Sequence, residues 1–234
     1  MCNINALKIA ERVDGVLSRI SKAAMDSGRR ACDVQLIAVT KFQTAESVRF
    51  AYDAGCRHFG ENYAQEAAGK RTELGVLGQD VWHMIGGLQT NKSMQAVQTF
   101  DCIHTIDRSK LALAVGSTAR SVERFVDVLI QVDLADTMGR SGCSPANIGF
   151  LVDDILAQSH LRLKGLMAMA PAGLGDTATR AAFAGVRRLY EALPTTCQCI
   201  LSMGMSGDYP LAIAEGATVV RVGTAIFGDR PKVG

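Results

Sequence analysis

Short apolar runs alternate with longer amphipathic stretches along most of the chain. We expect the short runs to be strands, because consecutive apolar positions are typical of a parallel sheet that is covered on both faces. These runs span residues 34–40, 57–60, 81–85, 102–105, 126–132, 163–168, 198–202 and 218–222.

The stretches between the runs carry apolar residues at helical spacing. They predict helices over residues 45–54, 63–74, 92–99, 109–122, 145–159, 177–192 and 209–215. Another amphipathic helix is expected before the first strand, over residues 4–26, and Gly28 supplies its stop signal. Its apolar face is formed by Ile4, Leu7, Ala10, Val13, Leu17 and Ile20.

Eight strands that each lead into a helix predict one (β/α)8 barrel of the TIM type, an α/β fold with an extra N-terminal helix. The chain of 234 residues suits a single domain over residues 1–234. A doubly wound open sheet is the alternative. Such a sheet normally has a glycine-rich phosphate loop after its first strand, whereas Lys41 stands at that place here.

Composition excludes several classes of partner. Hydrophobic residues make up 48% of the chain, charged residues 21%, and the net charge is +2, as in an ordinary globular protein. A charge this small provides no field that would recruit nucleic acid or a membrane surface. We find neither a signal peptide nor an apolar run long enough to cross a bilayer, and therefore expect a cytoplasmic protein.

The seven cysteines are scattered and form no pair of C-x-x-C motifs, so a zinc site is not expected. Cys197 and Cys199 lie two residues apart in a predicted strand, where they should share one face. We interpret them as packing thiols.

Candidate chemistry concentrates at the ends of the strands, which is where barrel enzymes place their active sites. Lys41 follows the first strand. A lone lysine there most simply extends its ammonium to solvent. A desolvated lysine instead has a lowered pKa and becomes a nucleophilic amine that can form an imine with an aldehyde.

The loops after the last two strands favour the second interpretation. They contain Gly204, Met205, Ser206 and Gly207, and then Gly223 and Thr224. Glycines let backbone N–H groups approach an anion, hydroxyls can donate to it, and the helix starts that follow add positive dipole ends. Barrels often bind phosphate with these two loops. Together with Lys41 they indicate a phosphorylated ligand.

Three other polar residues are candidates, and two of them, Arg221 and His83, have two interpretations each. Arg221 lies between valines on the last strand, where a buried charge needs a partner. That partner is either an acid such as Glu61 or Asp133, or the ring nitrogen of a bound pyridine. His83 is either a satisfied core histidine or part of the wall against a ring. Asn62 could support a ring hydroxyl.

The chain resembles the YggS/PROSC family of pyridoxal-phosphate homeostasis proteins over residues 5–230. The resemblance rests on segments that occur in the family's order: residues 38–41 (AVTK), 59–63 (FGENY), 82–86 (WHMIG), 88–93 (LQTNKS), 104–107 (HTID), 165–168 (GLMA), 201–206 (LSMGMS) and 221–228 (RVGTAIFG).

The resemblance implies a barrel of the alanine-racemase type, fold type III among pyridoxal 5′-phosphate (PLP) proteins. It implies an imine at Lys41, phosphate binding around Ser206, Gly223 and Thr224, and Arg221 at the pyridine nitrogen. The full set of expected cofactor-binding residues is Lys41, Asn62, His83, Met205, Ser206, Arg221, Gly223 and Thr224. The chain departs from the usual family pattern at Thr40, Phe42, Gly87 and Arg140.

The expected function is to hold and release PLP in vitamin B6 homeostasis, with apo PLP enzymes as possible acceptors and a monomer or weak homodimer as the assembly. An arginine at the ring nitrogen would keep it unprotonated and weaken the electron sink of PLP. Racemases of this fold also add a β-domain with a catalytic tyrosine, for which the chain has no room. We therefore expect binding more than catalysis. A weak amino-acid racemase is the alternative, and an aldolase-type imine of Lys41 with a phosphorylated sugar is a third.

Overall fold

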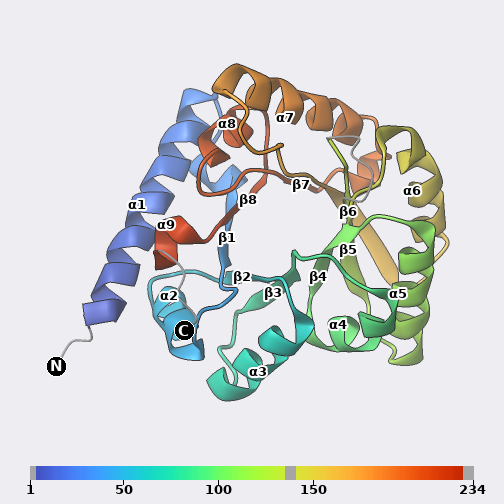
Figure 1. Ribbon diagram of the computed structural model, residues 1–234, viewed down its shortest axis with the longest axis horizontal. Helices are drawn as coiled ribbons and strands as arrows, with labels where there is room; N and C mark the ends of the chain where they lie inside the picture. Colours follow the sequence, from blue (N-terminus) through green and yellow to red (C-terminus); the bar gives the residue numbers. More distant parts are fainter. Residues whose placement is uncertain (1–3, 135–140, 229–234) are drawn as a thin grey trace.

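The apolar runs form eight parallel strands that close into a barrel in the order in which they occur in the chain (Figure 1). The computed structural model describes residues 4–134 and 141–228. β1 pairs with β8 as well as with β2, and this closure confirms the barrel over the open sheet. The strands are β1 (Gln35–Val39), β2 (His58–Glu61), β3 (Val81–Met84), β4 (Cys102–Ile106), β5 (Val126–Gln131), β6 (Leu161–Met167), β7 (Ile200–Ser202) and β8 (Val219–Val222).

The helices form an outer ring around the strands (Figure 1). They are α1 (Ile4–Asp26), α2 (Ala45–Asp53), α3 (Ala64–Leu74), α4 (Ser93–Thr99), α5 (Ser109–Ser121), α6 (Ile148–Leu156), α7 (Asp176–Glu191), α8 (Tyr209–Ala214) and α9 (Thr224–Phe227). The first helix has the predicted bounds, and most of the others begin or end within a residue or two of the prediction.

The predicted bounds were wrong for two elements, one helix and one strand, and a proline lies close to the start of each. Residues 145–147 form the 3-10 helix η3 (Pro145–Asn147) before α6, and the helix ends at Leu156. Residues 195–197 form the 3-10 helix η4 (Thr195–Cys197), so β7 begins only at Ile200. Cys197 is therefore a buried residue of η4 and Cys199 is exposed, and the two thiols do not share a strand face.

The extra helix α1 covers the side of the barrel where the chain closes. Its buried residues recur every three or four positions: Ile9, Val13, Val16, Ile20 and Ala24. The predicted apolar face was wrong at Ile4, Leu7 and Leu17, which are exposed. The buried residues pack in the main apolar core, and α1 lies against α2, α8 and α9. Because α9 has only four residues, α1 supplies apolar cover that a longer last helix would give.

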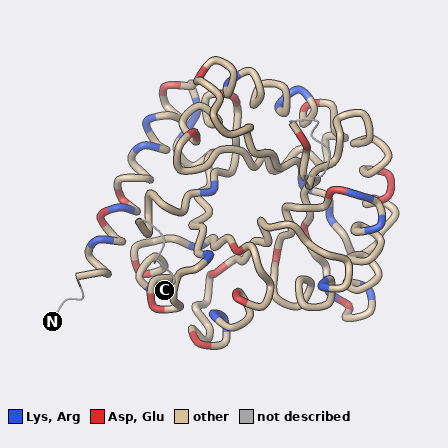
Figure 2. The backbone as a smooth tube through the Cα atoms, in the orientation of Figure 1, with Lys and Arg blue, Asp and Glu red and all other residues tan. Residues whose placement is uncertain are grey.

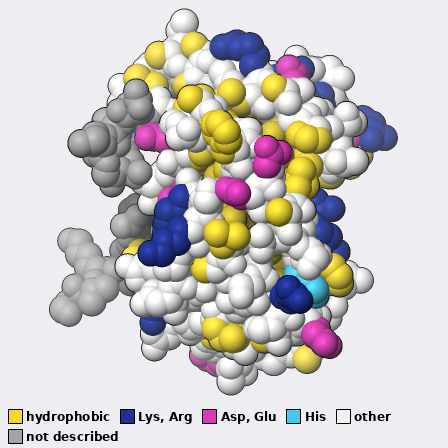
Figure 3. Space-filling model, turned by 90° about the vertical axis from the view of Figure 1, so that its right-hand side faces the viewer, with side chains coloured by type: hydrophobic (Ala, Val, Ile, Leu, Met, Phe, Trp, Pro, Cys, Tyr) yellow, Lys and Arg dark blue, Asp and Glu magenta, His cyan; other side chains and the backbone are white. Residues whose placement is uncertain are grey.

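Charged residues of both signs are distributed over the outer helices (Figure 2). On the face that carries α5 and α6, apolar side chains form separate patches between charged ones (Figure 3). Within residues 4–134 and 141–228, none of the helices has the length and apolar character needed to cross a bilayer.

Candidate functional site

A cavity of about 580 Å³ opens at the carboxyl ends of the strands. This volume lies within the range of roughly 300–1,000 Å³ that small ligands occupy. Its lining residues come from β1, β5 and β8 and from the segments after β1, β2, β3, β5, β6, β7 and β8: Val39, Lys41, Asn62, Ile85, Gly86, Gly87, Gln131, Ser141, Met169, Met205, Ser206, Gly207, Arg221, Gly223 and Thr224. The structure thus brings together every predicted site residue except His83.

Lys41 stands at the start of a tight turn after β1. The N–H of Gln43 donates to the Thr40 carbonyl at 2.9 Å and closes this turn. Phe42 has a φ of 64°, in the left-handed region that residues other than glycine rarely adopt. Its N–H donates to Glu66 Oε1 at 2.6 Å, which holds the turn against α3. The turn therefore fixes the backbone that carries Lys41.

The side chain of Phe42 lies at the surface. It is 46% exposed and its ring centroid is 6.3 Å from that of Tyr63, which is also exposed. Neither ring belongs to the residues that line the cavity. The departure from the family pattern at Phe42 therefore changes the outer rim and leaves the lining unchanged.

A buried ion pair beneath Lys41 was not predicted. Lys70 of α3 donates to Glu61 Oε1, Glu66 Oε1 and the Thr40 carbonyl, each at 2.6 Å. Thr40 also donates its hydroxyl to Glu61 Oε1 at 2.7 Å. Lys70 therefore ties the end of β1 to the end of β2, directly before Lys41.

Glu61 is fully buried, and its second oxygen, Oε2, has no hydrogen-bond partner among the described residues. Burial raises the pKa of Glu61 above its usual 4.5, while Lys70 and Thr40 oppose that rise. A sequence signal for this cluster existed, since Glu61 ends an apolar run. Its partner on α3 could not be read, because side-chain pairing between a strand and a helix depends on the tertiary packing.

The loops after β7 and β8 meet at the cavity as predicted. Gly223 N–H donates to Ser206 Oγ at 3.3 Å, which joins the two loops. Gly204 has a φ of 88°, and an added Cβ would come within 2.8 Å of Tyr209 Cα, so the turn requires glycine. Both following helices, α8 and α9, are short. Helix dipoles therefore contribute little at this place, and the hydroxyls and backbone N–H groups of the two loops are the donors that face the cavity.

Arg221 of β8 is buried at the floor of this cavity. Its Nη1 donates to Ser202 O at 2.8 Å and Ser202 Oγ at 2.6 Å, and its Nη2 donates to Ala168 O at 3.0 Å. Its partners are therefore neutral oxygens, and the acid Glu61 is engaged by Lys70 instead. Desolvation lowers the pKa of Arg221 to about 10, so it stays charged at neutral pH.

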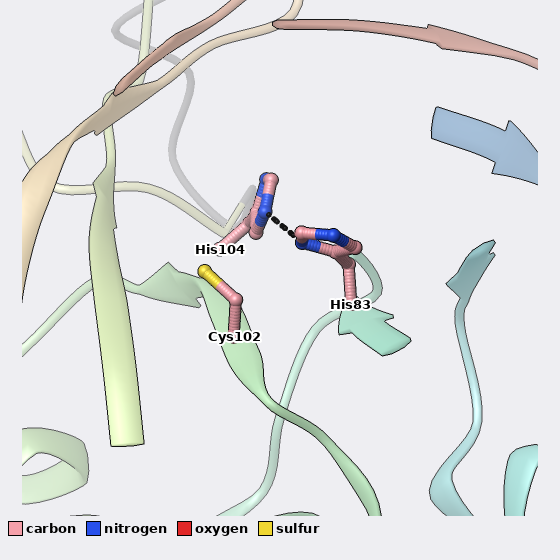
Figure 4. A group of neighbouring side chains, drawn as sticks. All are labelled: His83, Cys102 and His104. Atoms are coloured by element: carbon pink, nitrogen blue, oxygen red, sulfur yellow. Dashed lines mark hydrogen bonds between the residues drawn. The ribbon is translucent and has the colours of Figure 1, made fainter. Parts of the chain in front are cut away.

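His83 is the one predicted site residue that the structure does not place at the cavity. It is buried between His58, at 2.9 Å, and His104, at 3.0 Å. Figure 4 shows the His83–His104 contact beside the thiol of Cys102. The structure thus favours the first interpretation of His83, a satisfied core histidine. Arg140 lies outside the described residues.

Two further polar residues of the lining were not predicted. Gln131 ends β5, and its side-chain amide donates to Ser141 O at 2.8 Å. The chain returns to β5 through a bridge between Val132 and Cys143, and this return brings Ser141 to the cavity. Gln131 could have been found as the polar end of an apolar run. Ser141 could not, because its place depends on the path of the loop.

Comparisons with known proteins agree with this geometry. The family described as "Alanine racemase, N-terminal domain" matches residues 20–231. The "Pyridoxal phosphate homeostasis protein" of Pseudomonas aeruginosa is 41% identical over 222 residues, which cover 95% of this chain and 96% of that protein. The protein of the same name in Escherichia coli is 40% identical over 233 residues, covering 95% and 97%.

Two solved structures are informative. PipY of Synechococcus elongatus, with PLP bound, is similar with a TM-score of 0.83 and 40% identity, covering 94% of this chain and 100% of that one. A histidine racemase of Leuconostoc mesenteroides has a TM-score of 0.73 at 17% identity, covering 96% of this chain and 58% of that one. The second similarity concerns the fold alone.

Proposed function

The chain belongs to the alanine racemase N-terminal domain family and, within it, to the pyridoxal phosphate homeostasis proteins, and on this premise we propose that it holds PLP in the cavity as an imine of Lys41. The observation that carries the proposal is the composition of one cavity. An amine, an anion-binding pair of loops and a buried arginine all line it.

These residues fit the parts of PLP. The Lys41 amine would bind the aldehyde carbon, and the loops with Ser206, Gly223 and Thr224 would bind the phosphate. Arg221 would donate to the ring nitrogen and, as a permanent donor, keep it unprotonated. Asn62 and Met205 would form the remaining walls. When bound, PLP supplies an electrophilic carbon and an electron sink, and Arg221 opposes the second of these.

The geometry supports a binding role over racemisation. Two-sided proton transfer requires two positioned bases. Among the described residues that line the cavity, Lys41 is the one amine, and no tyrosine or histidine is present. We infer that the protein holds PLP and releases it to apo PLP enzymes in vitamin B6 homeostasis.

The direct test is the visible spectrum. The purified protein should be yellow or become yellow with added PLP, and borohydride should fix the cofactor to Lys41, as read by peptide mass spectrometry. Lys41→Ala should lose the band and keep its circular dichroism. Lys22→Ala, at an exposed lysine of α1, is the matched control and should keep it.

A protein that gains no visible band with PLP would refute the proposal and favour an aldolase-type imine with a phosphorylated sugar. Racemisation is tested separately with single-enantiomer amino acids in deuterated water. Exchange of the α-hydrogen at enzyme-like rates would overturn the binding role. Release is tested by mixing the PLP-loaded protein with an apo PLP enzyme and following the gain of activity.

A further inference from the structure

A continuous line of hydrogen bonds crosses the barrel interior and ends at Arg221. His58 Nδ1 lies 2.9 Å from His83 Nε2, and His83 Nδ1 lies 3.0 Å from His104 Nε2. His104 Nδ1 lies 3.2 Å from Ser202 Oγ, which also accepts from Arg221 Nη1 at 2.6 Å. We call these four residues, His58, His83, His104 and Ser202, the histidine chain. They lie on β2, β3, β4 and β7.

Arg221 determines which atom donates and which accepts at each hydrogen bond of the histidine chain. A guanidinium can only donate, so Ser202 Oγ accepts from Arg221. Ser202 Oγ has a second lone pair, but among the described residues its other hydrogen-bond partner is His104. The hydroxyl proton therefore has an acceptor there only if His104 Nδ1 is unprotonated. His104 must then be protonated at Nε2 and donate to His83 Nδ1. By the same step His83 is protonated at Nε2 and donates to His58 Nδ1.

The surroundings of His58, at one end of the histidine chain, differ from those of Arg221, which bonds to Ser202 at the other end. His58 is the first residue of β2 and is half-buried, at the amino end of the strands. Arg221 lines the cavity at the carboxyl ends. The two middle histidines are buried, and burial lowers the pKa of His83 to about 3 and that of His104 well below its usual value. They stay neutral, so a proton that the histidine chain gains as the pH falls goes to the half-buried His58.

Among the described residues, few charged or titratable groups surround the histidine chain. Burial lowers the pKa of His58, and Asp101, before β4, opposes that shift. His83 faces His58 from β3, and on the β1 side its register partner is the apolar Ile37. Farther along, Asp127 of β5 and Lys164 of β6 act on Cys102 beside the middle histidines.

A metal ion is not needed to explain the cluster. His83, Cys102 and His104 each place one possible ligand atom within 4.8 Å of the others (Figure 4). The facing nitrogens of the two histidines already bond to each other. Burial also raises the pKa of the Cys102 thiol, which opposes the thiolate that a metal requires.

We propose that the histidine chain positions Arg221 and couples its hold on Ser202 to the protonation of His58. A proton added at His58 Nδ1 turns that atom from acceptor to donor. The chain then stays bonded only if His83 and His104 both move their single proton from Nε2 to Nδ1. His104 would then donate to Ser202 Oγ beside Arg221, and the serine hydroxyl would lose its acceptor. Neutral His58 and the Arg221–Ser202 bond therefore favour each other.

The first test needs no cofactor. Long-range 1H–15N correlation spectra of the 15N-labelled apo protein report the tautomer of each histidine. We expect neutral His83 and His104, both protonated at Nε2, at every pH at which the protein is folded and His58 is neutral. A proton on Nδ1 of either residue in neutral protein would overturn the proposal, as would a metal that binds stoichiometrically and shifts these nitrogens.

The second test uses a matched pair of variants. Ser202→Ala removes the hydroxyl that fixes the direction, so mixed tautomers at His83 and His104 and an upward shift of the His58 titration are expected. Ser202→Thr keeps a hydroxyl and a strand-compatible shape, and should restore both. The ring signals of His160, which lies outside the histidine chain, should not change. If Ser202→Ala left the tautomers of His83 and His104 and the titration of His58 unchanged, the proposed coupling between His58 and the Arg221–Ser202 bond would be refuted.

A third arm rests on the proposed function. With PLP added, Ser202→Ala should bind more weakly than the wild type and lose the pH dependence of binding that follows His58, whereas Ser202→Thr should retain both. Identical pH profiles in all three proteins would contradict the coupling to Arg221. If the wild type fails to bind PLP, the proposed function fails, and the tautomer measurements still decide the histidine chain.

Discussion

Lys70 and Glu61 hold the end of β1 directly before Lys41, although neither residue lines the cavity. Lys70 is nearly buried and binds two carboxylates and the backbone carbonyl directly before Lys41. Removing one partner of a buried pair leaves the other charge without compensation. Substituting Lys70 or Glu61 should therefore lower the stability of the fold and also loosen the turn that carries Lys41.

Lys70→Met should lower the free energy of unfolding by about 3–5 kcal/mol, because Glu61 would be left as an uncompensated buried charge. Urea unfolding followed by circular dichroism measures this loss. Lys22→Met breaks the exposed i,i+4 pair with Asp26 and should cost about 0.5 kcal/mol or less. Equal effects in the two variants would contradict the importance of the buried pair.

Glu61→Gln should flatten the pH dependence of stability. Burial raises the pKa of Glu61 in the folded state above 4.5, so the folded protein holds this proton more tightly than the unfolded chain. The free energy of unfolding should therefore fall as the pH rises from 4.5 through the folded-state pKa. The variant lacks this term. Urea titrations at several pH values compare the two slopes, and identical slopes would show that Glu61 contributes none of it.

At the scale of elements, the segment after β3 contains two adjacent glycines, Gly86 and Gly87, and meets the segment after β2 at the first of them. A Cβ on Gly86 would lie 2.4 Å from the carbonyl oxygen of Asn62, so the two segments can approach only with glycine there. A Cβ on Gly87 would meet only Ser141 Oγ, at an ordinary 3.5 Å. A Cβ at the second position would therefore fit without a change in packing.

Gly86→Ala should destabilise the protein by about 1–3 kcal/mol through overpacking and should weaken PLP binding by displacing Asn62. Gly87→Ala, its neighbour, should be neutral or stabilise by up to about 1 kcal/mol, because it restricts the unfolded chain. Thermal unfolding and a PLP titration of both variants test this. Equal stability and equal PLP affinity in the two variants would show that the contact between Gly86 and Asn62 does not require glycine.

At the scale of the whole molecule, the cavity exists only because the barrel closes. Lys41 comes from the first strand and Arg221 from the last, and the two strands are paired at Ile37 and Arg221. A ligand that binds Lys41 and the last two loops together bridges this closure. It should stabilise the folded state by mass action, since the unfolded chain lacks the assembled site.

PLP at about 100 times its Kd should add about 2.7 kcal/mol and raise the Tm by roughly 5–10 °C for a chain of this length. Pyridoxal, which lacks the phosphate, should give a much smaller shift at the same concentration, and so should PLP with Lys41→Ala. Differential scanning calorimetry measures these shifts. Equal shifts with PLP and pyridoxal would argue against phosphate binding by the loops after β7 and β8.

The sequence by itself determined the strands, their order and the residues at their ends. Periodicity and apolar runs are local properties, and the ends of parallel strands must meet at one face of a barrel. For this reason the sequence alone could place Lys41, Ser206, Arg221 and Thr224 at one cavity.

Only the tertiary structure decided which side chains pair. It joined Lys70 to Glu61, returned Ser141 to the cavity and turned His83 away from it toward His58 and His104. These contacts depend on strand register, helix placement and loop path, which are set by packing between distant segments. A one-dimensional pattern places a polar residue at a strand end, and the closed barrel selects its partner.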